Sequence, residues 1–158
     1  MEQRLKNLRI IHMALTAPPI FMLGVFYFLR QSGQASNESP AELLYVAIGL
    51  AVFAPVLSHF ISGQLFAARI VQIKENLSIN EEQTVAVYQS PKIVQWALLE
   101  GPAFFQGVVF FLTGELLLLG LGGLLIAILA IQGPSLADLK KRLDISDTRL
   151  RQIQAASG

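Results

Sequence analysis

Charged residues divide the chain into four long stretches that carry almost no charge. These stretches lie between Arg9 and Arg30, Glu42 and Arg69, Lys92 and Glu115, and Glu115 and Asp138. Each holds roughly 20 residues or more, enough for a helix rising about 1.5 Å per residue to cross a hydrocarbon core of about 30 Å. The runs are continuous rather than alternating, which excludes a transmembrane barrel. The pattern predicts an all-α integral membrane protein, a bundle of four transmembrane helices.

Composition agrees with a membrane protein, because 53% of the 158 residues are hydrophobic and only 15% are charged. A cleavable signal peptide is the alternative for the first stretch, since basic residues precede it. That stretch is long, contains Pro18 and Pro19, and has no convincing small-residue cleavage site before Arg30. We therefore expect it to be a spanning helix.

The positions of the basic residues predict the orientation. Every Lys and Arg outside the stretches except Arg30 lies at the N-terminus, in the connection between the second and third helices, or in the tail. With four spans, these three places share one side of the membrane. Since basic residues are enriched on the cytoplasmic side, we expect both termini to be cytoplasmic and the membrane to be a bacterial inner membrane.

An internal repeat is visible in the sequence. Residues 9–29 align on residues 92–112 without a gap, and the identical pairs include Ala14 with Ala97, Leu15 with Leu98, Pro19 with Pro102, Phe21 with Phe104, Gly24 with Gly107 and Phe28 with Phe111. We predict two tandem hairpins, residues 1–80 and 81–158, arranged as a parallel repeat in one membrane domain. The second hairpin is expected to continue into a short amphipathic helix and a mobile tail.

The amphipathic helix is predicted from residues 135–143. Ser135 and Asp138 resemble a capping box, and the apolar face is formed by Leu136, Leu139 and Leu143. We expect this helix to lie on or near the cytoplasmic membrane surface. Binding of a cytoplasmic partner is the alternative.

Two further local patterns predict helix packing and a helix start. Small residues in the fourth stretch, Gly120, Gly122 and Gly123, would let a neighbouring helix approach closely. Ser90 followed by Pro91 predicts the start of the third helix.

Glu100 is the unusual residue, because it lies inside an apolar stretch. An ionisable group at the bilayer centre costs about 2.5 to 3.5 kcal/mol on insertion scales. We therefore expect Glu100 in a buried polar or ion site, for which the other candidates are His59, Ser58 and Thr16. Kinks are expected at Pro19, Pro55 and Pro102, since proline leaves a carbonyl one turn earlier without a partner. Glu100 could lock the bundle by binding such a carbonyl, carry an ion or proton, or contact another subunit.

A resemblance is carried by ALLEGPAFFQGVVFFL, residues 97–112. This helix resembles the ion-carrying helix of the proteolipid c subunits of rotary ATPases, and Glu100 would match their ion-binding carboxylate. In those proteolipids the acid belongs to the second helix of a hairpin, whereas Glu100 belongs to the first. The whole chain resembles small four-helix bacterial membrane proteins of unassigned function.

Motifs for other chemistry are absent from the sequence. There is no cysteine, and His12 and His59 have no metal-ligand spacing. There is no phosphate-binding loop, nucleophile elbow or nucleic-acid surface. We predict a non-enzymatic protein without cofactor, metal or nucleic-acid partner, an accessory subunit of a larger membrane assembly or a homo-oligomer in contact with lipid. The alternative is a proton- or sodium-coupled translocation component that uses Glu100.

Overall fold

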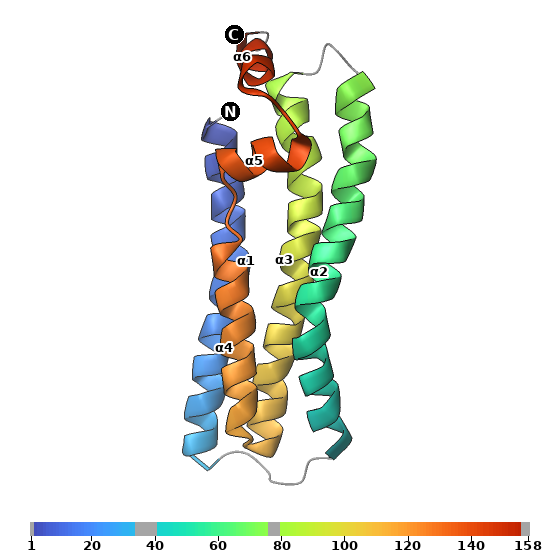
Figure 1. Ribbon diagram of the computed structural model, residues 1–158. Coiled ribbons are helices and arrows are strands. Elements are labelled where there is room, and N and C mark those ends of the chain that lie inside the picture. Colours follow the sequence, from blue (N-terminus) through green and yellow to red (C-terminus); the bar gives the residue numbers. More distant parts are fainter. Residues whose placement is uncertain (1, 34–40, 76–79, 156–158) are drawn as a thin grey trace.

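The computed structural model describes residues 2–33, 41–75 and 80–155. These residues form six helices and no strand: α1 (Glu2–Gln31), α2 (Ala41–Glu75), α3 (Glu81–Thr113), α4 (Leu116–Ile131), α5 (Leu136–Leu143) and α6 (Asp147–Ala155). Helices α1 to α4 run side by side, whereas α5 and α6 lie at one end (Figure 1). The predicted all-α class is confirmed.

Three of the helices are long and apolar enough to cross a membrane, namely α1, α2 and α3. Their 30, 35 and 33 residues extend roughly 45 to 53 Å, more than a hydrocarbon core of about 30 Å. The fourth expected span is shorter than predicted. Helix α4 has 16 residues and ends before Gly133 and Pro134, and it could count as a span only together with α5, beyond an 84° bend.

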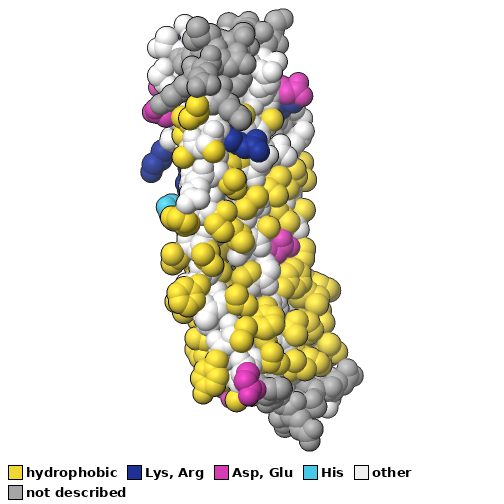
Figure 2. Space-filling model, turned by 90° about the vertical axis from the view of Figure 1, so that its right-hand side faces the viewer, with side chains coloured by type: hydrophobic (Ala, Val, Ile, Leu, Met, Phe, Trp, Pro, Cys, Tyr) yellow, Lys and Arg dark blue, Asp and Glu magenta, His cyan; other side chains and the backbone are white. Residues whose placement is uncertain are grey.

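The surface of α1 and α2 is strongly apolar. Their exposed large side chains include Ile20, Phe21, Phe28, Tyr45, Phe53 and Phe60. Figure 2 shows hydrophobic side chains over most of one face, with Lys and Arg gathered towards one end. An apolar surface of this extent is typical of contact with lipid or with other protein, rather than with water.

Helix α3 is the central helix of the structure. Helices α1, α2 and α4 all pack against it, and Figure 1 shows it between α1 and α2. Helices α3 and α4 therefore pack against each other directly, whereas α1 and α2 are separated by α3. The two predicted hairpins thus differ in their internal packing, and their superposition as a repeat stays a prediction.

The start of α3 differs from the sequence prediction. Asn80 caps the helix, since its side chain accepts a hydrogen bond from the amide of Gln83 and the Gln83 side chain accepts one from the amide of Asn80. This reciprocal capping box satisfies free amides at the helix start. The predicted start at Ser90 and Pro91 is wrong, because Pro91 lies inside a helix that already began ten residues earlier, at Glu81.

The tail beyond α5 contains more structure than a mobile segment would. Helix α6 continues to Ala155, and its side chains Leu150 and Ile153 are buried. The remaining part of the predicted mobile tail, residues 156–158, lies outside the described residues.

Leu23 and Phe26 of α1 pack at the junction of α1, α3 and α4, where a Cβ on Gly107 would lie 3.0 Å from Phe26. A Cβ on Gly107 would lie 3.1 Å from Leu23, and a Cβ on Gly122 would lie 3.3 Å from it. Leu23 therefore sits against two glycines, one on each neighbouring helix. Around Gly120 and Gly123 there is open space, so of the three glycines predicted to pack closely only Gly122 lies at a tight contact.

We expect Gly122→Val to destabilise the protein by about 1 to 3 kcal/mol, because the added atoms overpack the junction. Gly123→Val is the matched control, since it carries the same loss of flexibility and helix propensity without the contact. Thermal unfolding in mild detergent, followed by the fluorescence of the buried Trp96, measures both. Equal midpoints for the two variants would contradict the assigned packing.

Candidate functional site

Glu100 lies on an outward face of α3, roughly 20 Å from the end of the helix at Thr113. Its side chain is partly exposed and has no hydrogen bond or ion pair with any described residue. On the same face Ala97 and Gly101 are exposed, and a Cβ on Gly101 would meet no atom within 4 Å. Contrary to expectation, the carboxyl group is not enclosed by its own bundle.

The other predicted site residues are not joined to Glu100. Ser58 is buried, and its hydroxyl donates to the carbonyl of Pro55 at 2.9 Å. The hydroxyl of Thr16 donates to the carbonyl of His12 at 2.8 Å, and the His59 side chain is exposed. Both hydroxyls are therefore satisfied within their own helices, as is common for Ser and Thr in helix interiors.

The predicted lock between Glu100 and a freed carbonyl is not formed. Helices α1, α2 and α3 continue through Pro19, Pro55 and Pro102. Among the described residues Glu100 makes no hydrogen bond, so it does not bind the Leu98 carbonyl that Pro102 leaves free.

A buried polar cluster that the sequence did not reveal joins α5 to α3. We call its four residues, Tyr88, Lys92, Asp138 and Arg142, the clasp. The ammonium group of Lys92 lies 2.8 Å from a carboxylate oxygen of Asp138, and the Lys92 side chain is only 2% exposed. The Tyr88 hydroxyl donates to the same oxygen at 2.6 Å. Arg142 lies 3.4 Å from the other oxygen.

Local sequence places Asp138 at this position. Ser135 caps α5 by accepting a hydrogen bond from the Asp138 amide, as predicted. Burial would raise the pKa of Asp138, but the hydrogen bonds from Lys92 and Tyr88 outweigh it, so this pKa lies below its usual value. The carboxyl group is therefore ionised at neutral pH.

The apolar face of α5 packs against the bundle, and its place on or near the cytoplasmic membrane surface stays a prediction. Its apolar residues Leu139 and Leu143 are fully buried in the core of the protein. Figure 1 shows α5 lying across the end of the bundle, beside α3. The ion pair of Lys92 with Asp138 holds α5 in this position, because an ammonium group buried in α3 needs a carboxylate nearby.

A second polar junction joins α1, α3 and the end of α4. Nε2 of His12 lies 2.9 Å from the carbonyl oxygen of Leu129, and the rings of His12 and Trp96 have centroids 4.6 Å apart. The indole of Trp96 donates to the carbonyl of Gln132 at 3.2 Å. These contacts satisfy carbonyls at the end of α4, where helical partners are missing.

Both junctions join helices through hydrogen bonds and ion pairs. Within the described ranges no group of three or more His, Asp or Glu residues could hold a metal ion. The clasp pairs its one carboxylate with two cations and a phenol. The geometry serves to hold helices together.

Comparisons with known proteins give no relative: no protein family, no curated protein and no solved structure matches the chain. The fold defines a class only, an all-helical protein with three helices long and apolar enough to cross a membrane. The structure adds two polar features, the partly exposed carboxyl group of Glu100 and the clasp.

We expect Asp138→Asn to lower the free energy of unfolding by about 3 kcal/mol, because Lys92 would remain buried without a carboxylate. The control is Asp147→Asn, which removes the exposed ion pair of Asp147 with Lys140 and should leave the unfolding midpoint nearly unchanged. Denaturation in detergent measures both variants. A midpoint for Asp138→Asn close to that of the control would contradict the role of the clasp.

The ion pair of Lys92 with Asp138 should also make the stability of the protein depend on pH. Since folding lowers the pKa of Asp138, its contribution is complete above the ordinary aspartate range, near pH 4, and is lost as the pH falls through the folded pKa. The stability difference between the wild-type protein and Asp138→Asn should therefore shrink on acidification. A difference that stays constant from neutral pH to about pH 2 would contradict this.

Proposed function

We propose that the protein is a non-enzymatic integral membrane subunit that binds another membrane helix on the open face of α3. The apolar surface of α1 and α2 and the lengths of α1, α2 and α3 support membrane insertion. The partner is another membrane subunit or a second copy of the chain.

Four crossings with cytoplasmic termini fit the arrangement of the helices. Helices α1 and α3 begin at the end where α5 and α6 lie, and α2 and α4 begin at the opposite end (Figure 1). Helix α4 supplies about 24 Å, and residues 133–135 can add at most about 10 Å, so the two together slightly exceed a core of about 30 Å. The bias of Lys and Arg towards the first end supports a cytoplasmic location, as in a bacterial inner membrane.

A tandem repeat remains our hypothesis for the origin of the chain. The ungapped match of residues 9–29 with residues 92–112 supports it, and the matched parts of α1 and α3 run in the same direction (Figure 1). Different packing of α2 and α4 around α3 would then have arisen after the duplication.

The observation that carries the proposed function is the unpaired carboxyl group of Glu100. The stretches of α3 before and after Glu100 are apolar. A carboxyl group at this depth in lipid is unfavourable unless a partner satisfies it. Ala97 and Gly101 leave room beside it for another helix, and interhelical hydrogen bonds stabilise such contacts. A donor from a neighbouring helix would therefore satisfy Glu100 and fix the register of the two helices.

The alternative function is proton- or sodium-coupled translocation. The partly exposed position of Glu100 favours this function, because a carboxyl group at an interface between subunits could exchange a proton or bind a cation. The two functions differ in whether the charge of the carboxylate is needed.

We expect Gly101→Leu to abolish association, because its side chain would occupy the space for the second helix. The fold should be retained, since no atom of the other described helices lies within 4 Å of the added Cβ. Gly123→Leu is the matched control, since it is equally free of neighbours but lies on α4. Native mass measurement after mild-detergent extraction reports the assembly.

Two results would contradict the proposal: a wild-type chain that is monomeric and without partners, or equal loss of association in both glycine variants. Glu100→Gln separates the two functions, because an amide keeps hydrogen bonding but loses the charge. Assembly, and any ion transport that the wild-type protein shows, should both survive in this variant. Retained assembly with loss of sodium or proton transport in reconstituted vesicles would instead establish the translocation function.

A further inference from the structure

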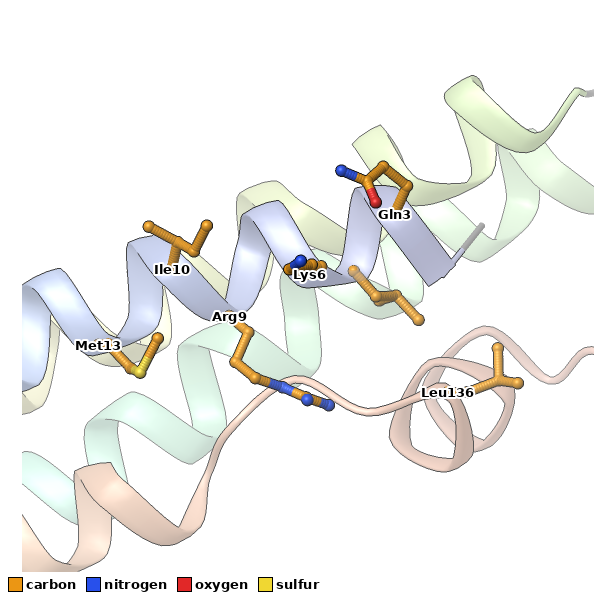
Figure 3. Close-up of a pocket in the computed structure, with 7 residues that line it drawn as sticks. Gln3, Lys6, Arg9, Ile10, Met13 and Leu136 are labelled. Carbon is orange, nitrogen blue, oxygen red and sulfur yellow. The ribbon is translucent and has the colours of Figure 1, made fainter.

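A cavity of about 580 Å³ lies beside the first turns of α1 and is bounded on its other side by the start of α5. The side chains that define its character are Lys6, Arg9, Ile10, Met13 and Leu136. Figure 3 shows them: Arg9 extends from α1 towards the segment that leads into α5, and Leu136 lies on that second helix. The cavity is open to the surroundings of the bundle.

The cations of this cavity have no partner in the described chain. Lys6 and Arg9 are exposed, and neither has a hydrogen bond or ion pair with a described residue. None of the described lining residues is acidic. Arg4, two residues before Lys6, differs in pairing with Glu82 at 3.2 Å. Two unpaired cations side by side favour an anionic ligand.

Apolar side chains continue the same face of α1 towards the middle of the bundle. Ile10 and Met13 are more than half exposed, and they follow Lys6 by one and two turns. Beyond them a second hollow of about 360 Å³ is lined by apolar residues that include Ile20, Phe21 and Phe28. From Arg9 to Ile20 the helix rises about 17 Å, close to half of a hydrocarbon core of about 30 Å.

We propose that this face of α1 binds an anionic phospholipid of the cytoplasmic leaflet, with its phosphate between Lys6 and Arg9 and an acyl chain along Ile10, Met13 and Ile20. The proposal rests on membrane insertion with a cytoplasmic N-terminus. Charge complementarity selects the headgroup, since basic pockets at the membrane surface bind anionic lipids. The apolar face, one leaflet long, selects a ligand with a hydrocarbon chain over a free anion.

Native mass spectrometry of the purified full-length protein tests the site. The protein in mild detergent is titrated with phosphatidylglycerol, with phosphatidylcholine of the same acyl chains, or with inorganic phosphate, and retained molecules are counted. Phosphatidylglycerol should be retained roughly tenfold more tightly than phosphatidylcholine. Lys6→Gln/Arg9→Gln should abolish this preference. Lys141→Gln/Arg151→Gln removes two exposed cations elsewhere and should keep it.

Three results would overturn the lipid site: equal retention of the two lipids, an unchanged preference in Lys6→Gln/Arg9→Gln, or displacement of the lipid by inorganic phosphate. The last result would indicate a site for a soluble anion. Thermal unfolding of each variant excludes misfolding as the cause of a lost preference. Alkaline carbonate extraction tests membrane insertion separately, so a protein that stays in the membrane but shows no lipid preference would refute only this site.

Discussion

Hydrogen bonds from polar side chains buried along α3 determine which helix lies where. Apolar side chains alone give membrane helices little preference for one another over lipid, so polar contacts and close packing must specify the arrangement. Gln106 donates to the carbonyl of Ala47 in α2 at 2.6 Å, Trp96 to the end of α4, and Lys92 to Asp138 in α5. Each bond fixes one neighbour at one height along α3.

The opposite end of the bundle is fixed by α1. Arg30 donates to the carbonyl of Phe111 at 2.6 Å, near the C-terminal end of α3, where free carbonyls and the helix dipole favour a cation. Gly114 turns the chain there with a φ of 78°, and a Cβ on it would collide with the Arg30 guanidinium. Both ends of α3 are thus tied to other helices, while Ala97 and Gly101 beside Glu100 stay exposed.

Sequence reasoning succeeded where one local rule decides the structure. Apolar stretches must be helical in lipid because their backbone groups need internal partners, and the cap at Ser135 is a contact across three residues. Sequence reasoning failed to place the side chains of Glu100 and His59, because counting residues gives only the height of a residue along its helix axis. The direction of a side chain depends on how its helix is rotated by packing. The bond of Lys92 with Asp138 depends on the placement of α5, which no local pattern encodes.

The central claim is that the face of α3 around Glu100 is covered by another protein helix in the membrane. A photo-reactive residue at position 97, which is exposed on this face, tests it most directly in intact membranes. The same residue at position 123 on α4 serves for comparison. We predict a protein adduct of discrete mass from position 97 and none from position 123. Lipid adducts alone from position 97, or the same protein adducts from both positions, would contradict the claim.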